Sequence, residues 1–235
     1  VSVVAIAFDP ADPSHAFAAA SNGGTGTLNA LWVSHDAGLS WTKTSIEVSH
    51  YVSGVRFAAA DYQVVWASSS NLADDEAWVY WSSNGGVSFA ARPWLDQPSG
   101  LSLGSLAVVA TSATDAQTAW VRTYGVPNRV WLTTNAGVAF DEVLAAGGIA
   151  DVDALPDGRV WVATSTSGFL LSLDGRTFAP AGSEPRPRGF AHDGRGLFTA
   201  TDPNLDPFAL TVSSSGDPRT PINYSSMQPR PAPPP

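Results

Sequence analysis

The feature that most constrains the fold of this sequence is a short strand-like segment that recurs five times. Each copy has one aromatic residue, then small or β-branched residues, then a hydroxyl-rich end. Successive aromatic residues are 49, 54, 41 and 37 positions apart, a period typical of a unit of several strands rather than of a solenoid rung. The copies are HAFAAAS (15–21), VVWASSS (64–70), TAWVRTY (118–124), RVWVATS (159–165) and GLFTATD (196–202), with Phe17, Trp66, Trp120, Trp161 and Phe198 as the aromatics.

Three further strands are expected around each copy. An apolar strand and a short turn precede it, and two of these turns are the hairpin-forming pairs Asp157-Gly158 and Asp193-Gly194. A polar loop, a third strand and a short fourth strand follow it. The sequence therefore predicts an all-β protein, a β-propeller of four-stranded antiparallel blades, with a parallel β-helix as the main alternative. The predicted units cover residues 1–48, 49–102, 103–149, 150–186 and 187–224, before a Pro-rich tail at 225–235.

Composition supports this fold and excludes several function classes. The 21 glycines, 18 prolines and 14% charged residues favour turns and sheets over long exposed helices. A net charge of −9 disfavours nucleic acid and anionic membrane surfaces as partners. The chain has no cysteine, and it lacks the run of about 18 apolar residues that a membrane-spanning helix needs.

The number of blades has two alternatives. The first unit starts on its innermost strand and the last ends on its outermost strand, so no strand remains to splice the first blade to the last. The five units form either a ring closed by side-chain packing or a portion of a larger ring. Since the sequence begins inside an apparent strand, we expect a mature fragment, a trimmed domain or an incomplete gene product. The Pro-rich tail is expected to tether the propeller to further segments of a longer chain.

A polar turn closed by an aromatic residue follows the third strand in four of the five units. We call these turns the boxes: SHDAGLSW (34–41), SSNGGVSF (82–89), TTNAGVAF (133–140) and the shortened SLDGRTF (172–178). Asp or Asn at the start of a turn accepts backbone hydrogen bonds, and glycine permits positive φ. Because Asn replaces Asp in two boxes, and the boxes lie on different blades, we interpret them as structural clasps rather than catalytic or calcium sites. Their key residues are Ser34, Asp36, Gly38, Trp41, Asn84, Gly86, Phe89, Asn135, Gly137, Phe140, Asp174 and Phe178.

The first box carries a family resemblance. It matches Ser-x-Asp-x-Gly-x-(Ser/Thr)-Trp, so the chain, to about residue 222, resembles the Asp-box or bacterial neuraminidase repeat propellers. That superfamily includes sialidases, xyloglucan-active glycosidases, sortilin-type receptors and photosystem assembly factors. The resemblance implies the propeller fold and places the boxes on the outer rim, away from the substrate face. It implies no single activity, because one fold serves many functions.

Charged residues that break the repeat pattern mark a candidate ligand site. Arg122 stands where the other second strands have alanine or serine, and Arg56 and Asp153 interrupt apolar positions on innermost strands. They line the channel or its mouth, where they either bind a ligand or pair with one another and with water. We align Arg122 with Ala19, Ser68, Ala163 and Ala200; Arg56 with Ala7, Val108, Ala154 and Phe190; and Asp153 with Ile6, Val55, Ala107 and Gly189.

Loops expected on the face opposite the boxes supply further candidates. The acidic triplet Asp74, Asp75 and Glu76 is either a solvated loop or a calcium or substrate site. Trp94 either stacks on a sugar or packs under its own loop. No metal site is expected, because the four histidines lack metal-ligand spacing. These loop candidates are Asp74, Asp75, Glu76, Trp94, Tyr124 and Arg129.

The preferred functional hypothesis is a non-catalytic, exported module, extracellular, periplasmic or at the cell surface, that binds a protein or glycan without a cofactor. The alternatives are a glycoside hydrolase and a purely structural spacer. The resemblance to sialidases implies an arginine cluster, a tyrosine nucleophile and acidic partners. However, the Arg-Ile-Pro signature of that family is absent, and VRFAA (55–59) is a poor substitute. A xyloglucanase-like enzyme would need two opposed carboxylates, of which Asp153 offers one.

Overall fold

In the part of the chain that the structure describes, the regular secondary structure consists of β-strands. The computed structural model describes residues 2–21, 29–46, 51–71, 76–94, 106–182, 187–192, 197–201, 210–213 and 222–223. Within these ranges twenty strands form five sheets of four antiparallel strands, and the order within each sheet follows the chain. The described part contains no helix that is long and apolar enough to cross a membrane.

Each sheet corresponds to one sequence unit, and its innermost strand comes first. The first sheet contains β1 (Ser2–Phe8), β2 (Ala16–Ser21), β3 (Ala30–Ser34) and β4 (Thr42–Lys43). The second contains β5 (Tyr51–Ala58), β6 (Asp61–Asn71), β7 (Glu76–Ser82) and β8 (Ala90–Pro93). The third contains β9 (Leu106–Thr111), β10 (Ala119–Thr123), β11 (Asn128–Thr133) and β12 (Asp141–Ala146). The fourth contains β13 (Ile149–Ala154), β14 (Val160–Thr164), β15 (Gly168–Ser172) and β16 (Ala179–Gly182). The fifth contains β17 (Pro187–His192), β18 (Leu197–Thr201), β19 (Leu210–Ser213) and β20 (Ile222–Asn223).

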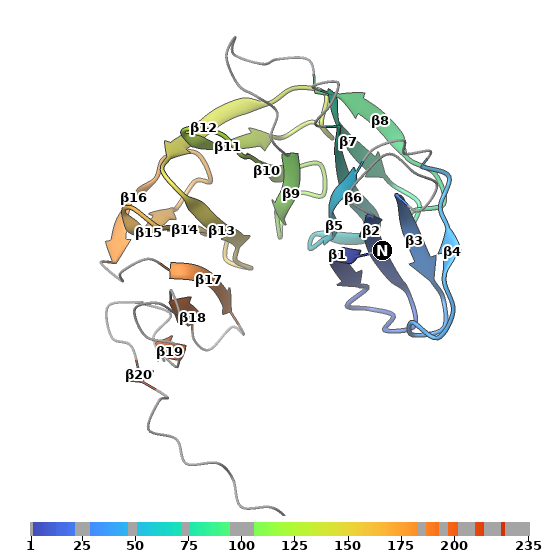
Figure 1. Ribbon diagram of the computed structural model, residues 1–235, viewed down its shortest axis with the longest axis horizontal. Helices are drawn as coiled ribbons and strands as arrows, with labels where there is room; N and C mark the ends of the chain where they lie inside the picture. Colours follow the sequence, from blue (N-terminus) through green and yellow to red (C-terminus); the bar gives the residue numbers. More distant parts are fainter. Residues whose placement is uncertain are drawn as a thin grey trace, which may run out of the picture.

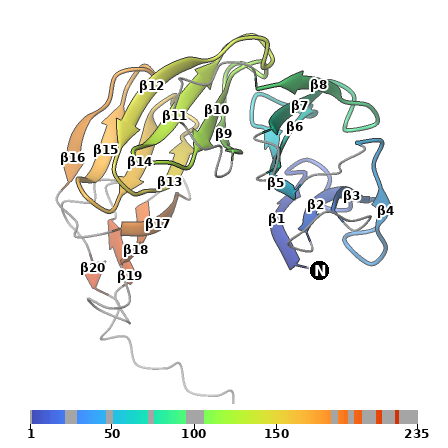
Figure 2. The same ribbon diagram turned by 45° about the horizontal axis from the view of Figure 1, so that its top comes forward.

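The five sheets stand side by side along an arc, as the blades of a propeller do (Figure 1). Their first strands lie on the concave side, and consecutive first strands contact one another along the series β1, β5, β9, β13 and β17. The first and fifth sheets occupy the two ends of the arc, with a gap between them that also appears in the turned view (Figure 2). The predicted fold class is confirmed, and the arc is open between its two ends.

Apolar side chains fill the spaces between neighbouring sheets. Phe17 and Leu31 of the first sheet pack with Val55 and Phe57 of the second in one buried cluster. Equivalent clusters join the second sheet to the third and the third to the fourth. Burial of apolar area contributes roughly 25 cal/mol per Å², so these clusters supply much of the stability that holds the blades together.

The recurring aromatic residue has a specific role at these interfaces, because it contacts the box glycine of the next sheet. Phe17 lies so close to Gly86 that a Cβ atom there would overlap its ring. A Cβ on Gly175 would come within 2.6 Å of the Trp120 ring, and the Nε1 of Trp120 donates a 3.0 Å hydrogen bond to the Gly175 carbonyl. Trp66 faces Gly137 in the same way, 3.6 Å from where its Cβ would lie. The periodic aromatic is therefore the contact that joins one blade to the next.

Candidate functional site

The first box is a turn whose polar groups are satisfied within the turn itself. The Ser34 hydroxyl donates to Asp36 Oδ1 over 2.8 Å and accepts the amide N–H of Gly38 over 2.8 Å. Asp36 also accepts the Ser40 amide over 2.8 Å, and the indole N–H of Trp41 donates to the Gly38 carbonyl over 3.0 Å. Gly38 has a φ of +88°, in the left-handed region that favours glycine. Ser34, Asp36, Gly38, Ser40 and Trp41 therefore each have a local structural role in this box.

The next two boxes repeat this geometry with asparagine. Ser82 and Thr133 donate to the side-chain oxygens of Asn84 and Asn135 over 2.8 and 3.0 Å. The same oxygens accept the amides of Ser88 and Ala139 over 3.0 and 2.9 Å. An amide oxygen therefore serves as well as a carboxylate oxygen here, which argues against proton transfer as the purpose of the position.

The acidic boxes hold their carboxylates in the ionised form. The Ser40 hydroxyl, followed by the Ser40 amide, lowers the pKa of Asp36 to about 2. In the shortened box, the amides of Thr177 and Arg176 and the hydroxyl of Ser172 lower the pKa of Asp174 far below its ordinary value. Each of these carboxyl groups is ionised at neutral pH, and its oxygens accept hydrogen bonds within its own turn. Such a group is poorly suited to general acid catalysis.

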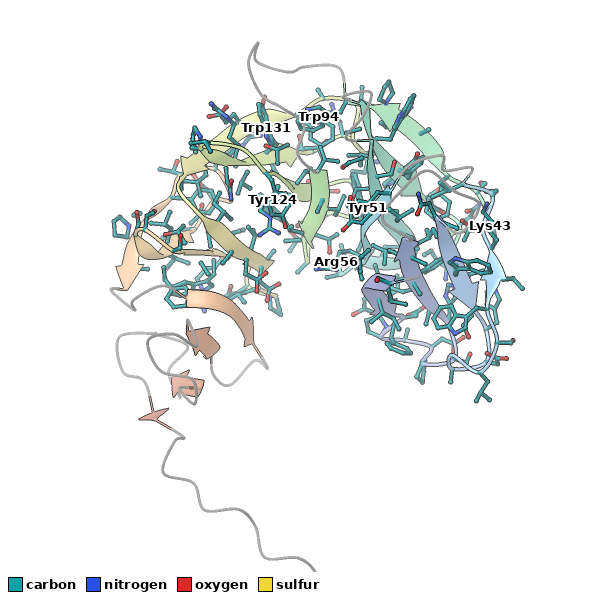
Figure 3. The ribbon with its side chains drawn as sticks, viewed as in Figure 1. Lys43, Tyr51, Arg56, Trp94, Tyr124 and Trp131 are labelled. Carbon is teal, nitrogen blue, oxygen red and sulfur yellow. The ribbon has the colours of Figure 1, made fainter. Side chains whose placement is uncertain are left out.

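The residues that break the repeat pattern lie on the concave side of the arc. Arg122 lies in β10, one residue before its end, and reaches across to β13, where its Nη1 donates to the carbonyl oxygens of Ile149 and Ala150 over 3.0 and 2.7 Å. Its guanidinium carbon lies 4.1 Å from the ring centroid of Tyr124, in cation–π contact. Figure 3 shows Tyr124 and Arg56 on this concave side, whereas Trp94 and Trp131 lie towards the outside of the arc.

Arg56 is held in a similar way, one blade earlier. Its Nε donates to the carbonyl of Val109 on β9 over 3.3 Å, and its Nη1 to the carbonyl of Val55 over 2.9 Å. Burial lowers the pKa of Arg122 to about 10, while the carboxylate of Asp151 raises it and the positive charge of Arg56 lowers it. The guanidinium group of Arg122 therefore remains charged at neutral pH, and the positive charge of Arg56 acts on it electrostatically.

The strand register corrects the sequence alignment of these charges by one position. Arg56 pairs with Trp66 and Asp153 pairs with Trp161, so the two charges occupy the same position on different blades, which is also the position of Ala7. Val152, not Asp153, is the equivalent of Ile6 and Val55. The carboxylate that affects Arg122 is that of Asp151, which the sequence reasoning did not single out. No described contact brings Arg56, Arg122 and Asp153 together as one cluster.

The other candidates have separate locations. Trp94 is buried between the second and third sheets, where its ring lies 4.6 Å from Phe140 and 5.3 Å from Trp131, so it packs in the core. Arg129 forms an ion pair with Glu142 on the neighbouring β12. Asp74 and Asp75 lie outside the described residues, as does the side chain of Glu76. Among the described residues, no group of three or more His, Asp or Glu side chains could hold a metal ion.

The concave surface therefore combines the guanidinium groups of Arg56 and Arg122 and the Tyr124 ring with the carboxylates of Asp151 and Asp153 on β13. The Nε of Arg122 is buried and has no hydrogen-bond partner among the described residues. Asp151 and Asp153 lie two positions apart on one strand, and so on one side of it, rather than facing each other across a cleft. This arrangement suits recognition of an anionic group better than hydrolysis by two opposed carboxylates.

Comparisons with known proteins support the fold. The chain is similar to the structure of the GH74 xyloglucanase from Xanthomonas campestris, with a TM-score of 0.68 and 18% identity over 98% of this chain and 38% of that one. It is also similar to YCF48 bound to D1 peptide, with a TM-score of 0.61 and 14% identity over 95% of this chain and 67% of that one. YCF48 from Cyanidioschyzon merolae gives a TM-score of 0.61 and 14% identity over 94% of this chain and 70% of that one.

The same comparisons assign no activity. No protein-family profile matches the chain, and no curated protein matches it. At these identities the similarity to solved structures establishes the β-propeller fold alone. The chain spans 38% of the xyloglucanase, so the activity of that whole enzyme does not transfer to it.

Proposed function

We propose that this protein is a non-catalytic Asp-box propeller that binds a carboxylate-bearing segment of a protein or an acidic glycan on its concave surface. The observation that carries the proposal is the Arg122 guanidinium, which two carbonyl oxygens hold in place above the Tyr124 ring. A guanidinium fixed in this way loses little freedom when it meets a planar anion.

The electrostatics of the surface support an anionic ligand. Arg56 and Arg122 repel each other, and only Asp151 is seen to offset this at Arg122. The salt bridges found among the described residues are His15–Asp9, Arg129–Glu142, Arg159–Asp157 and Arg176–Asp141, whereas both concave arginines are held by neutral carbonyl groups. A bound carboxylate would relieve this repulsion and could use the remaining guanidinium donors.

The structural neighbours and the boxes add support of a more general kind. One neighbour is bound to a peptide and another is a xyloglucanase, so propellers of this shape are compatible with both peptide and glycan ligands. The hydrogen bonds within the boxes are those expected of Asp-box turns. We therefore include membership of the Asp-box superfamily in the proposal. We further propose that the protein is exported, as the scarcity of lysine and the net charge of −9 suggest.

Titration calorimetry tests the binding proposal. Acidic peptides and uronic-acid or sialylated glycans are titrated against neutral peptides and neutral β-glucans of equal length. We expect binding of an acidic probe, and a loss of about tenfold or more in affinity for Arg122→Gln, because hydrogen bonds to charged groups contribute about 1.5–3 kcal/mol. Arg129→Gln is the matched control, since Arg129 is already paired with Glu142. Equal affinity of the two variants, or no preference for acidic probes, would overturn the proposal.

The alternative of a glycoside hydrolase is favoured only by the similarity to the xyloglucanase fold. Incubation with xyloglucan and sialyl substrates, followed by measurement of released reducing ends or sialic acid, decides between the two. We expect no turnover. Hydrolysis that Asp153→Ala abolishes would replace the binding proposal with an enzyme.

A further inference from the structure

The outward face of the first sheet exposes large apolar side chains. Val3, Ile6 and Phe8 share one face of β1 at the end of the arc, while Ala5 and Ala7 pack with the cluster shared with the second sheet. Ile6 and Phe8 are each 49% exposed. Scattered exposed apolar residues are common, but a row of them along one strand indicates a surface that another element covers.

The same positions are covered in the next three sheets. Strand register makes Val55, Val108 and Val152 the equivalents of Ile6, since each lies opposite the residue that follows the recurring aromatic. Their exposed fractions are 0%, 1% and 2%, against 49% for Ile6. Phe57, the equivalent of Phe8, is 7% exposed. The exposure of the first sheet is therefore a matter of position in the arc and not of residue type.

The three interfaces between the first four sheets share one arrangement. In each one, the preceding sheet contributes a large aromatic from its second strand, and the following sheet contributes its innermost strand and its box glycine. Gly86, Gly137 and Gly175 face Phe17, Trp66 and Trp120 of the sheet before them. Among the described residues, Trp41 of its own box is the only neighbour within 4 Å of a Cβ atom placed on Gly38 of the first sheet. The first sheet thus has the innermost strand and the box glycine of this interface, and among the described residues its innermost strand is the part of this face that stays exposed.

We propose that this face receives one further four-stranded blade, with a large aromatic on its second strand, that belongs to the same polypeptide. Each of the three interfaces described above joins sheets that are consecutive in the chain, and the proposed contact continues that series. A second copy of the protein would bring five sheets, rather than one, to a space bounded by the other end of the arc (Figure 1). Self-association is also opposed by the net charge of −9.

A cysteine-accessibility experiment tests this proposal, and the absence of natural cysteines makes the reporter unique. Ile6→Cys is introduced into the chain as it stands, and into a chain in which a second copy of residues 51–105 is joined ahead of Val1. That copy supplies a complete blade with its own Trp66 and its natural connector. We expect alkylation of the introduced thiol to slow by about tenfold or more when the blade is added, because reaction then requires local opening. An unchanged rate would overturn the proposal.

Two controls separate the proposal from simpler explanations. Val55→Cys occupies the equivalent covered position, so its thiol should react slowly with or without the added blade, which shows that the second sheet is folded. Replacement of the added copy's Trp66 by alanine should restore much of the fast reaction at position 6, because the aromatic contact is lost. Fast alkylation of the thiol at position 55 in the original chain would show that packing between two blades does not protect a side chain. That result would contradict the basis of the proposal.

Sedimentation velocity decides whether a second copy occupies the face instead. We expect the unfused chain to sediment as a monomer from about 1 to 100 μM, the range in which weak protein associations appear. Ile6→Glu should leave this behaviour unchanged. A concentration-dependent dimer that Ile6→Glu dissociates would assign the face to a second copy, and would contradict the proposed blade.

Discussion

The boxes and the concave surface differ in how well the repeats agree with one another. At the boxes, serine or threonine, an Asx side chain and an aromatic recur, and the hydrogen bonds recur with them. On the concave surface, Arg122 stands where other blades have small residues, and Arg56 shares its position with Asp153 and Ala7. Agreement between repeats therefore identifies residues that build each blade, and disagreement identifies residues that the fold alone does not require.

The largest expected effect comes from removing an aromatic that joins two blades. Trp120→Ala deletes a buried ring and its hydrogen bond to the box of the next sheet, so we expect a loss of about 3–5 kcal/mol in the free energy of unfolding. Urea denaturation measures it. Leu39→Ala is the control, because Leu39 lies in a box but is 89% exposed. A loss in Trp120→Ala no greater than in Leu39→Ala would show that the boxes and their partners act independently.

A smaller effect should distinguish two box glycines of nearly equal backbone conformation. Gly38 and Gly86 have φ values of +88° and +81°, but only Gly86 faces an aromatic from the preceding sheet. Gly38→Ala should cost roughly 1 kcal/mol for the left-handed conformation alone. Gly86→Ala should cost roughly 1–3 kcal/mol more, because its methyl group meets the Phe17 ring. Equal losses in denaturation would mean that this aromatic contact is dispensable.

The smallest expected effect is a change in pH dependence at the first box. Because hydrogen bonds lower the pKa of Asp36 to about 2, this carboxylate contributes stability above about pH 4, and that contribution is lost as the pH falls towards 2. Asp36→Asn imitates Asn84 and should preserve the turn at neutral pH. Thermal unfolding between pH 6 and pH 2 should therefore show a weaker acid destabilisation in the variant. Parallel curves for both proteins would indicate that Asp36 titrates normally.

Much of the scaffold could be predicted from local sequence. Four-strand units followed from the spacing of the aromatics, and the hairpin predicted at Asp157-Gly158 joins β13 to β14, with Gly158 at a φ of +88°. The hydrogen bonds of the boxes also followed from residue types, because they form between residues at most four positions apart. The predicted turn at Asp193-Gly194 lies outside the described residues.

The candidate site was less predictable, because it depends on register and on neighbouring sheets. The turns between first and second strands differ in length, so the sequence alignment matched Asp153 with Ile6 and Val55, whereas the strand register matches it with Ala7 and Arg56. Asp151 escaped notice because its effect on Arg122 arises between two blades. Trp94 had two possible roles in the sequence, and its burial against Phe140 depends on a residue from the following unit.

The sequence by itself determined that this chain forms blades, because hairpins and polar turns depend on interactions between residues close in the chain. Only the tertiary structure decided which blade faces are covered and which charges meet. Ile6 and Val55 are both β-branched apolar residues in the same register, and yet one is half exposed and the other fully buried. The physical reason is that burial is a property of what packs against a side chain, and in this arc the packing partner comes from the preceding blade.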